Sequence, residues 1–443
     1  MDKTLKPLVK IISIFTVCII LFSLIGKISR GEKPAGNTDA PPLTDTGGAY
    51  GDALSDYERN GMKGIWISYI EFQSVDFSSR ESFTKDITQM FENCKDMGLN
   101  TVIVHARPFG DAFYKSSFFP YSHIMTGTQG VGVGYDPMEI MIEIAHSIGL
   151  RFEAWVNPYR VKLYNHPKEL SADNPAQKSE LTITTDSGIY YNPALQEVRD
   201  LVTEGVVEIV KNYNVDGIHF DDYFYPDTAT ELDAAHYAAY SGNMSLEDWR
   251  RENVNMLVKQ VYAAVKQANP DVIFGISPQG NDDNNYHMQY SDIKLWLGEK
   301  GYADYIMPQL YWGFDYTTKS GSDRYAFKNL SYEWSQYKKA DSVKLYMGLG
   351  AYRIGDGDGS YKDSTEWQDG HNLADMMQVT KANPRLDGYA LYSYNKAFFQ
   401  FVAEGNDFSG VLLQKLSILL HFLSINVHSL PPVFTVICMV AIF

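Results

Sequence analysis

Cysteine and metal-binding patterns are scarce in this sequence. Its 443 residues include three cysteines, Cys18, Cys94 and Cys438, which lie far apart. This spacing forms neither a disulfide framework nor the paired cysteines of a zinc site. Cys94 falls on the apolar face of a predicted helix, where it suits the core. Because H-x-H and H-E-x-x-H patterns are also missing, the sequence predicts no metal or other cofactor and argues against a metallohydrolase.

Positively charged residues are also few, and several common catalytic motifs are absent. The 38 Lys and Arg residues are outnumbered by 54 Asp and Glu, and the formal net charge of -16 argues against a nucleic-acid partner. There is no G-x-S-x-G turn of a serine hydrolase. No glycine-rich phosphate loop follows the first predicted strand, where the chain reads Ser68-Tyr69-Ile70-Glu71. The stretch Gly355–Gly359, GDGDG, lacks the spacing and closing Glu of an EF-hand and predicts a surface turn.

The two chain ends differ from the body in composition. Three lysines precede an unbroken apolar run, Ile11–Gly26, which is the order of a secretory n-region and h-region. Because no good cleavage site follows, we expect residues 1–30 to be an uncleaved membrane anchor with the body exported; a cleaved signal is the alternative. Residues 31–60, rich in Pro, Gly, Asp and Thr, predict a flexible linker. Residues 409–443 form an atypical hydrophobic C-terminal tail.

Strand-like and helical patterns alternate eight times between residues 61 and 408. The predicted strands are short, rich in β-branched or aromatic residues, and bounded by Gly or Pro. They are Gly64–Tyr69, Thr101–Arg107, Arg151–Asn157, Gly217–Asp222, Val272–Ser277, Tyr305–Trp312, Leu345–Tyr352 and Gly388–Tyr394. Helix starts are marked by Asp136 before Pro137 and by Ser245 before two acidic residues. Eight βα units predict an α/β protein with a (β/α)8 TIM barrel; an open doubly wound sheet is the alternative.

One predicted strand carries acids where an apolar face is expected. The stretch Asp216–Pro226 reads DGIHFDDYFYP. Side chains alternate along a strand, so Ile218 and Phe220 share one face while His219 and Asp221 share the other. A parallel strand covered on both faces is normally almost all apolar. The polar face indicates either a buried His–Asp hydrogen bond or an Asp cap, or a catalytic carboxylate at the C-terminal end of a barrel strand.

Polar and aromatic residues also follow the other predicted strands. Active sites of such barrels lie at the C-terminal strand ends, so alternation predicts which side chains face inward. These are Trp66, Ser68, His105, Arg107, Glu153, Trp155, Asn157, His219, Asp221, Gly275, Ser277, Gln309, Tyr311, Gly348 and Gly350. His105 and His219 could join Asp221 as metal ligands, but hydrogen-bonding roles are favoured. The mixture of acids, amides, an arginine and aromatic rings suits a neutral, polyhydroxylated ligand.

Glycoside hydrolysis requires one protonated and one ionised carboxyl group. We expect Asp221 to be the ionised group, with Arg107 or His105 lowering its pKa. The candidates for the acid are Asp222, Glu153, Asp282 and Asp283. Because adjacent residues of a regular strand point apart, Asp222 alternatively only orients its neighbours.

Six motifs resemble the bacterial glycosyl-hydrolase-like family 10 barrels, over about residues 61–400. In chain order they are VIVHARPFGDAFYKSSFFPYS, EAWVNPYRV, DGIHFDDYFYP, GISPQGN, DYIMPQLYW and GYALYSY. The resemblance implies an exported TIM-barrel glycosidase of cell-wall peptidoglycan, since some members are similar to hydrolases of denuded glycan strands. Glu153 departs from the family pattern, which lowers it as a catalytic candidate. Cys18 lacks the lipobox of the lipoprotein members.

Residues and motifs together predict a site and a function. The predicted catalytic residues are Asp221, Asp222 and Glu153. The predicted substrate-binding residues are His105, Arg107, Trp155, Asn157, Arg160, His219, Tyr223, Gln309, Tyr311 and Trp312. We expect a polysaccharide substrate, the membrane as a partner of the N-terminal segment, and no nucleic acid. The alternative function is a non-catalytic glycan-binding or wall-scaffold protein on the same barrel.

Overall fold

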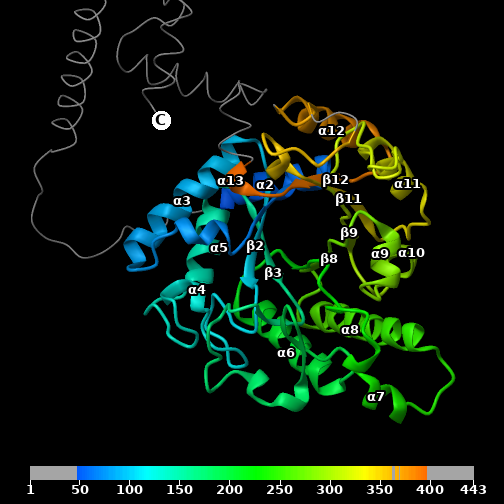
Figure 1. Ribbon diagram of the computed structural model, residues 1–443. Coiled ribbons are helices and arrows are strands. Elements are labelled where there is room, and N and C mark those ends of the chain that lie inside the picture. Colours follow the sequence, from blue (N-terminus) through cyan, green and yellow to red (C-terminus); the bar gives the residue numbers. More distant parts are fainter. Residues whose placement is uncertain (1–46, 362–364, 369, 397–443) are drawn as a thin grey trace, which may run out of the picture. The chain divides into compact units, whose positions relative to one another are not determined.

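The computed structural model describes residues 47–361, 365–368 and 370–396 (Figure 1). The predicted anchor, residues 1–30, and the predicted tail, residues 409–443, lie outside these described residues. None of the helices that are described combines the length and the apolar character needed to cross a bilayer.

Eight parallel strands of the described chain close into a ring. They are β1 (Met62–Ile67), β2 (Thr101–Arg107), β3 (Arg151–Val156), β7 (Gly217–Phe220), β8 (Ile273–Ile276), β9 (Tyr305–Ile306) continued by β10 (Gln309–Leu310), β11 (Lys344–Leu349) and β12 (Gly388–Leu391). Each strand pairs with the next, β9 and β10 both pair with β11, and β12 pairs with β1 to complete the ring. The predicted TIM barrel is therefore confirmed, and the open sheet is wrong.

Helices surround the ring, as Figure 1 shows from one end of the barrel. The long ones are α3 (Arg80–Asp96), α5 (Pro137–Ser147), α6 (Gln196–Asn212), α8 (Leu246–Ala268), α11 (Phe327–Gln336) and α12 (His371–Ala382). Shorter ones are α4 (His123–Thr126), α7 (Ala234–Ala239), α9 (Asp282–His287), α10 (Ile293–Gly298) and α13 (Tyr394–Lys396). The predicted starts of α5 and α8 are confirmed, because the side chains of Asp136 and Ser245 accept backbone N–H groups of the first turn.

Alternation along the strands produces two apolar layers. Val102, Val104 and similar side chains pack outward against the helices. A second cluster fills the barrel interior with large rings, including Trp66, Trp155 and Tyr305. Gly275 makes room for this filling, since a Cβ there would lie 1.9 Å from the Tyr305 ring. Burial of each such ring stabilises the fold by roughly 1.5–3 kcal/mol, so the interior is a packed core beneath the site.

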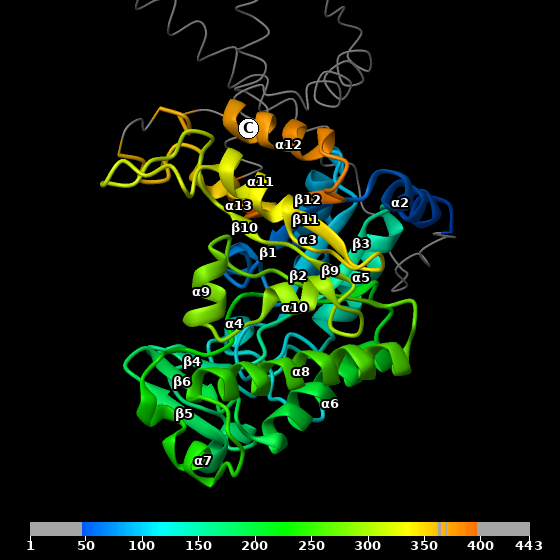
Figure 2. The same cartoon turned by 90° about the vertical axis from the view of Figure 1, so that its right-hand side faces the viewer.

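A small antiparallel sheet, which the sequence did not predict, lies between β3 and α6. It consists of β4 (Arg160–Leu163), β6 (Gly188–Tyr191) and β5 (Thr182–Thr185), paired in that order. Figure 2 shows it beside α7, on the side of the molecule away from α2. Because β4 begins four residues after β3 ends, the sheet delivers Arg160 and Leu163 to the C-terminal end of the barrel.

The predicted linker ends earlier than residue 60, because Gly47–Asn60 forms the helix α2. Ala53 is buried, and Tyr57, four residues on, packs against the interior cluster of the barrel. The Tyr57 hydroxyl lies 2.8 Å from that of Tyr346, and the Arg151 guanidinium stacks 4.1 Å from the Tyr57 ring. This helical spacing of apolar residues gives α2 a buried face, so it covers the N-terminal end of the barrel.

Asp216, just before β7, joins four parts of the fold. Its Oδ2 accepts hydrogen bonds from His146 Nε2 at 2.9 Å and from the Phe152 backbone N–H at 2.7 Å. The Tyr50 hydroxyl of α2 donates to Oδ1, and Arg151 Nη1 lies 3.7 Å from that oxygen. Burial opposes ionisation of this carboxyl, but the His146 hydrogen bond and the Arg151 charge hold its pKa below the ordinary value. Asp216 therefore anchors the strand that carries the acidic pair.

We expect Asp216→Ala to lower the free energy of unfolding by about 3–5 kcal/mol, because it leaves Arg151 buried without its anion. A carboxyl with a lowered pKa stabilises the fold fully above its unfolded pKa of about 3.9, and this stabilisation is lost as the pH falls through the lower folded value. Urea titrations across pH should therefore show a shallower acid loss for Asp216→Asn than for wild type. The control is Asp283→Asn, an exposed site. A change no larger than the control's would contradict this role.

Candidate active site

A pocket of about 240 Å³ opens at the C-terminal ends of the barrel strands. It is lined by Trp66, Ser68, Tyr69, Ile70, His105, Trp155, Arg160, Leu163, Asp221, Asp222, Tyr223, Ser277, Gln309, Tyr311 and Tyr392. These residues come from the ends of seven barrel strands and from β4. The pocket thus gathers most of the side chains that alternation placed inside the barrel.

Asp221 is held by hydrogen-bond donors on both of its oxygens. Trp155 Nε1 donates to Oδ2 at 3.2 Å, and the Asn157 amide lies 3.2 and 3.3 Å from the two oxygens. The Tyr223 backbone N–H donates to Oδ1 at 3.2 Å. Every partner is an N–H group, and donors of this kind favour the ionised carboxylate. The alternative of a hydrogen bond between His219 and Asp221 is wrong, because His219 instead bonds to Trp66, Tyr305 and Ser277.

Asp222 lies beside Asp221, and the two carboxyl groups titrate as a pair. Burial, and then the charge of Asp222, raise the pKa of Asp221 to about 7, although Arg160 opposes the shift. Burial also raises the pKa of Asp222, whose Oδ1 accepts a hydrogen bond from Gln309 Nε2 at 3.1 Å. Two neighbouring buried carboxyl groups share a proton, and such values belong to the pair. The pair therefore keeps one proton close to neutral pH.

The expected lowering of the Asp221 pKa by Arg107 or His105 is wrong. A bulge in β2 shifts the register between His105 and Arg107, and a one-residue shift moves a side chain to the other face. The Arg107 guanidinium consequently lies outside the pocket, 4.3 Å from the Phe119 ring. Burial lowers the pKa of His105 far below its usual value, so this ring is neutral.

Arg160 is the cation of the pocket. Its guanidinium lies 4.9 Å from the Phe109 ring and 5.0 Å from the Tyr223 ring, and its Nε donates to the Pro108 carbonyl at 2.9 Å. Its backbone N–H donates to Asn157 Oδ1 at 3.0 Å, which fixes the orientation of the amide that binds Asp221. Arg160 therefore orders the carboxylate both through its charge and through its backbone.

His105 offers the pocket a donor of fixed direction. The Tyr69 backbone N–H donates to its Nδ1 at 3.2 Å, so the neutral ring carries its proton on Nε2. The ring stacks on Trp155 with centroids 3.4 Å apart. Within the described residues Nε2 has no hydrogen-bond partner although it is buried. A ligand oxygen in the pocket would satisfy it.

A chain of hydrogen bonds runs beneath the pocket and includes two predicted site residues. Trp66 Nε1 donates to His219 Nε2 at 3.0 Å, and Ser277 Oγ lies at the same distance from that atom. His219 must then carry its proton on Nδ1, which faces the Tyr305 hydroxyl at 2.7 Å. Tyr305 in turn donates to Glu153 Oε2 at 2.6 Å. His219 and Glu153 thus lie behind the pocket wall, where they position the side chains that line it.

The remaining sequence candidates lie apart from the pocket. Trp312 stacks on Tyr325 with centroids 5.5 Å apart. On α9, Asp282 pairs with Lys294 at 2.8 Å and Asp283 is half exposed beside Arg324. None of the three lines the pocket, so their predicted roles have no geometric support.

Several lining residues were missing from the predicted site. Tyr69 and Ile70 follow β1, Leu163 ends β4, and Tyr392 follows β12. Tyr392 lies in the motif GYALYSY, so its position at a strand end was a usable signal. Leu163 had no such signal, because its place depends on the small sheet.

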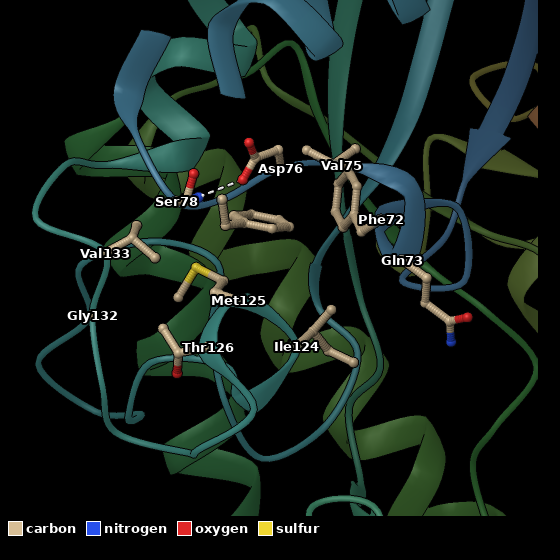
Figure 3. Close-up of a pocket in the computed structure, with 11 residues that line it drawn as sticks. Phe72, Gln73, Val75, Asp76, Ser78, Ile124, Met125, Thr126, Gly132 and Val133 are labelled. Atoms are coloured by element: carbon tan, nitrogen blue, oxygen red, sulfur yellow. Dashed lines mark hydrogen bonds between the residues drawn. The ribbon is translucent and has the colours of Figure 1, made fainter. Parts of the chain in front are cut away.

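A second hollow lies beside the segment that follows β1 (Figure 3). It encloses about 560 Å³ between the 3-10 helix Glu71–Ser74, the turn at Asp76 and Ser78, and the loop that follows α4. Ser78 hydrogen bonds keep the pKa of exposed Asp76 below its usual value. This groove has a single carboxylate, that of Asp76, so the paired chemistry belongs to the smaller pocket.

Comparisons with known proteins agree with this geometry. The family described as "Glycosyl hydrolase-like 10" matches residues 61–369. The chain is similar to "Glycosyl hydrolase YngK" of Bacillus subtilis (strain 168), with 36% identity over 75% of this chain and 68% of the relative. It is also similar to "Glycosyl hydrolase DigH" of Escherichia coli (strain K12), with 30% identity over 79% of this chain and 87% of the relative.

A solved structure shares the fold. The "PgaB (BpsB) glycoside hydrolase domain from Bordetella bronchiseptica" aligns with a TM-score of 0.53 and 13% identity, over 79% of this chain and 97% of that domain. At this identity the likeness concerns the barrel alone.

The paired titration makes a prediction that is independent of activity. Asp222→Asn removes one member of the pair, so the two groups no longer share a proton and we expect the aspartate titration near pH 7 to move clearly downward. Carboxyl infrared bands recorded across pH, with isotope-labelled aspartate, would follow this group. The control is Asp283→Asn, which should leave the titration near pH 7 in place. An unchanged titration in Asp222→Asn would contradict the pairing.

Proposed function

Because the chain belongs to the glycosyl hydrolase-like 10 family, we propose that it is a glycoside hydrolase of cell-wall peptidoglycan glycan. The observation that carries the proposal is the buried Asp221–Asp222 pair, which keeps one proton near neutral pH and opens into a pocket. A protonated and an ionised carboxyl group are the two reagents of glycoside cleavage. The names of the relatives, both glycosyl hydrolases, agree with this chemistry.

The pocket walls suit a sugar ring. Trp66, Trp155, Tyr311 and Tyr392 present aromatic surface, onto which the CH face of a sugar can stack. Gln309 offers an amide and His105 an N–H group for hydroxyls. A pocket somewhat below the 300–1,000 Å³ of drug-sized ligands suits one sugar ring of a longer strand.

The carboxyl groups take different roles in the reaction. Asp221, surrounded by N–H donors, is the ionised group that stabilises positive charge at the anomeric carbon. Asp222 is the proton donor to the leaving oxygen, since it lines the pocket and is less deeply buried than Asp221. Arg160 keeps a positive charge near the pair when the proton has left.

The placement of the protein is also a proposal. We infer from the basic start and the apolar run Ile11–Gly26 that residues 1–30 direct export and anchor the chain, followed by a linker up to about residue 46. Residues 61–408 form the catalytic barrel domain, and residues 409–443 a hydrophobic tail. An exported, anchored barrel would meet wall glycan at the membrane surface.

The direct test uses the full-length protein with purified wall glycan, in peptide-free and peptide-bearing forms, and identifies products by mass. We expect soluble sugar fragments from the peptide-free strands. Binding without any cleavage would favour the glycan-binding alternative, and neither binding nor cleavage would contradict the proposal.

We expect Asp221→Asn to lower turnover by at least about a hundredfold, equivalent to about 2.7 kcal/mol of transition-state stabilisation. The substitution keeps the shape of the side chain and removes its charge, so thermal unfolding should resemble that of wild type. Asp222→Asn should also lower turnover, whereas Asp283→Asn is the control outside the pocket. Wild-type turnover in a folded Asp221→Asn protein would show that Asp221 is structural.

The pH dependence should have a basic limb near pH 7. The raised pKa keeps a proton on the pair up to about pH 7, so kcat/KM should fall about tenfold per unit as the pH rises beyond it. Burial raises the pKa of Glu153 to about 7 as well, so Glu153→Gln is the control that separates the two groups. The basic limb should persist in that variant. Its disappearance there, or a profile flat to high pH, would contradict the assignment to the pair.

A further inference from the structure

A single turn of the chain joins the groove of about 560 Å³ to the pocket that holds the acidic pair. Ile70 lines the pocket, whereas Phe72 and Gln73 line the groove. The Gln73 backbone N–H donates to the Ile70 carbonyl at 3.2 Å, so these two residues begin and end one 3-10 turn. The two hollows are therefore neighbours on the surface, and a long ligand bound in the pocket can reach the groove.

Buried hydrogen bonds and ring contacts hold this turn in place. Glu71 is buried, and its Oε2 accepts hydrogen bonds from the Ser68 backbone N–H at 2.8 Å and from Ser68 Oγ at 2.5 Å. Ser68 Oγ also accepts the Ile70 backbone N–H at 3.2 Å. The Phe72 ring packs edge-on against Phe113, with centroids 4.9 Å apart. Because the turn is already ordered, a ligand that binds along it pays little entropy for ordering it.

The side chain of Ile70 is exposed where the pocket meets the groove. It leaves 49% of its surface to solvent although it lines a pocket. One exposed apolar side chain needs no explanation by itself, but this one lies three residues from Gln73, at the boundary between two hollows. Its methyl groups offer a contact to the CH groups of a ligand that passes from one hollow to the other.

The polar groups of the groove suit a neutral ligand that is rich in hydroxyl groups. Figure 3 shows Gln73 at one end of the groove and Val133 at the other, with Asp76 between them. None of the eleven lining residues is Lys, Arg or His, and Asp76 has no salt bridge within the described part of the chain. An anionic ligand would face this carboxylate without a compensating cation. Hydroxyl groups can instead donate to Asp76 and exchange hydrogen bonds with the Gln73 amide.

We propose that this groove is a second glycan-binding site, which holds the sugars next to the cleaved one on the same strand. Gln73 and Asp76 bind their hydroxyl groups, and Ile70 contacts the strand as it passes from the pocket to the groove. This inference rests on the proposed function and adds to it a site for the uncleaved part of the strand and a dependence on strand length.

The contacts of the groove should act on binding rather than on the chemical step. Once one sugar is in the pocket, its neighbours on the strand reach the groove as an intramolecular event, so even modest contacts raise the affinity. These contacts lie away from the carboxyl pair and do not change during bond cleavage. Interactions that are equal in the ground state and the transition state lower KM and leave kcat almost unchanged.

The kinetic test compares full-length wild type and Gln73→Ala on a peptide-free wall disaccharide and octasaccharide. We expect wild type to have the lower KM on the octasaccharide. Gln73→Ala should raise that KM by about tenfold and leave kcat within about twofold, with both constants unchanged on the disaccharide. Thr126→Trp, which fills the groove, should have the same effect. The matched control is Gln378→Ala, which removes an exposed glutamine of α12.

A binding measurement tests the groove without turnover. It uses the full-length Asp221→Asn variant and hydrogen exchange of the backbone amides read by mass spectrometry. We expect the octasaccharide, but not the disaccharide, to slow exchange in residues 70–78. Adding Gln73→Ala to this variant should weaken that protection, whereas adding Gln378→Ala should leave it in place.

The outcomes separate this inference from the proposed function. An octasaccharide KM that does not change in Gln73→Ala, or a wild-type KM that is equal for both lengths, would overturn the groove site and leave the hydrolase assignment intact. An equal loss on both substrates would show that the turn only supports the pocket. Protection of residues 70–78 by peptide-bearing strands alone would assign the groove to the stem peptide instead. If wild type cleaves neither substrate, the proposed function fails, and absence of octasaccharide protection would overturn the groove site as well.

Discussion

The structure depends most on the burial of two adjacent carboxyl groups at the end of β7. Burial disfavours charge on both, and each charge disfavours the other, so the pair resists complete ionisation. The surrounding groups fix the orientation of the two carboxyl groups. N–H donors converge on Asp221, an amide holds Asp222, and Arg160 supplies one positive charge nearby. A site of this kind retains a proton where isolated aspartates have lost theirs.

The barrel provides the stiffness that such a pair needs. Below the pocket, aromatic rings fill the barrel interior. A series of hydrogen bonds, each donated in the same direction, runs from Trp66 through His219 and Tyr305 to Glu153 and holds these side chains in place. Burial lowers the pKa of His219 to about 3, so this chain carries no histidine charge that would disturb the pair. At the other end of β7, Asp216 ties the strand to α2, α5 and β3. Packing and hydrogen bonds thus hold β7 in place from the N-terminal end of the barrel, covered by α2, to the C-terminal end, where the pocket opens.

Sequence patterns predicted the barrel well, because eight short apolar strands and capped helices are local signals. The polar face of the fourth strand likewise identified Asp221. Prediction failed where geometry depends on one residue or on distant contacts. The bulge in β2 turned Arg107 away from the site. The predicted linker, residues 31–60, missed the helix Gly47–Asn60, because the buried face of this helix is defined by its contacts with the barrel. Arg160 was named from a motif, but its place beside Asp221 follows from a small sheet without a clear sequence signal.

The central claim is that the pair holds one proton near neutral pH and holds it on Asp222. Neutron diffraction from deuterium-exchanged crystals at about pH 6 would locate that proton directly, because deuterium scatters as strongly as carbon. The account predicts a deuteron on Asp222 and none on Asp221, with the donors of Trp155, Asn157 and Tyr223 all directed at Asp221. Two bare carboxylates, or a deuteron on Asp221, would contradict it.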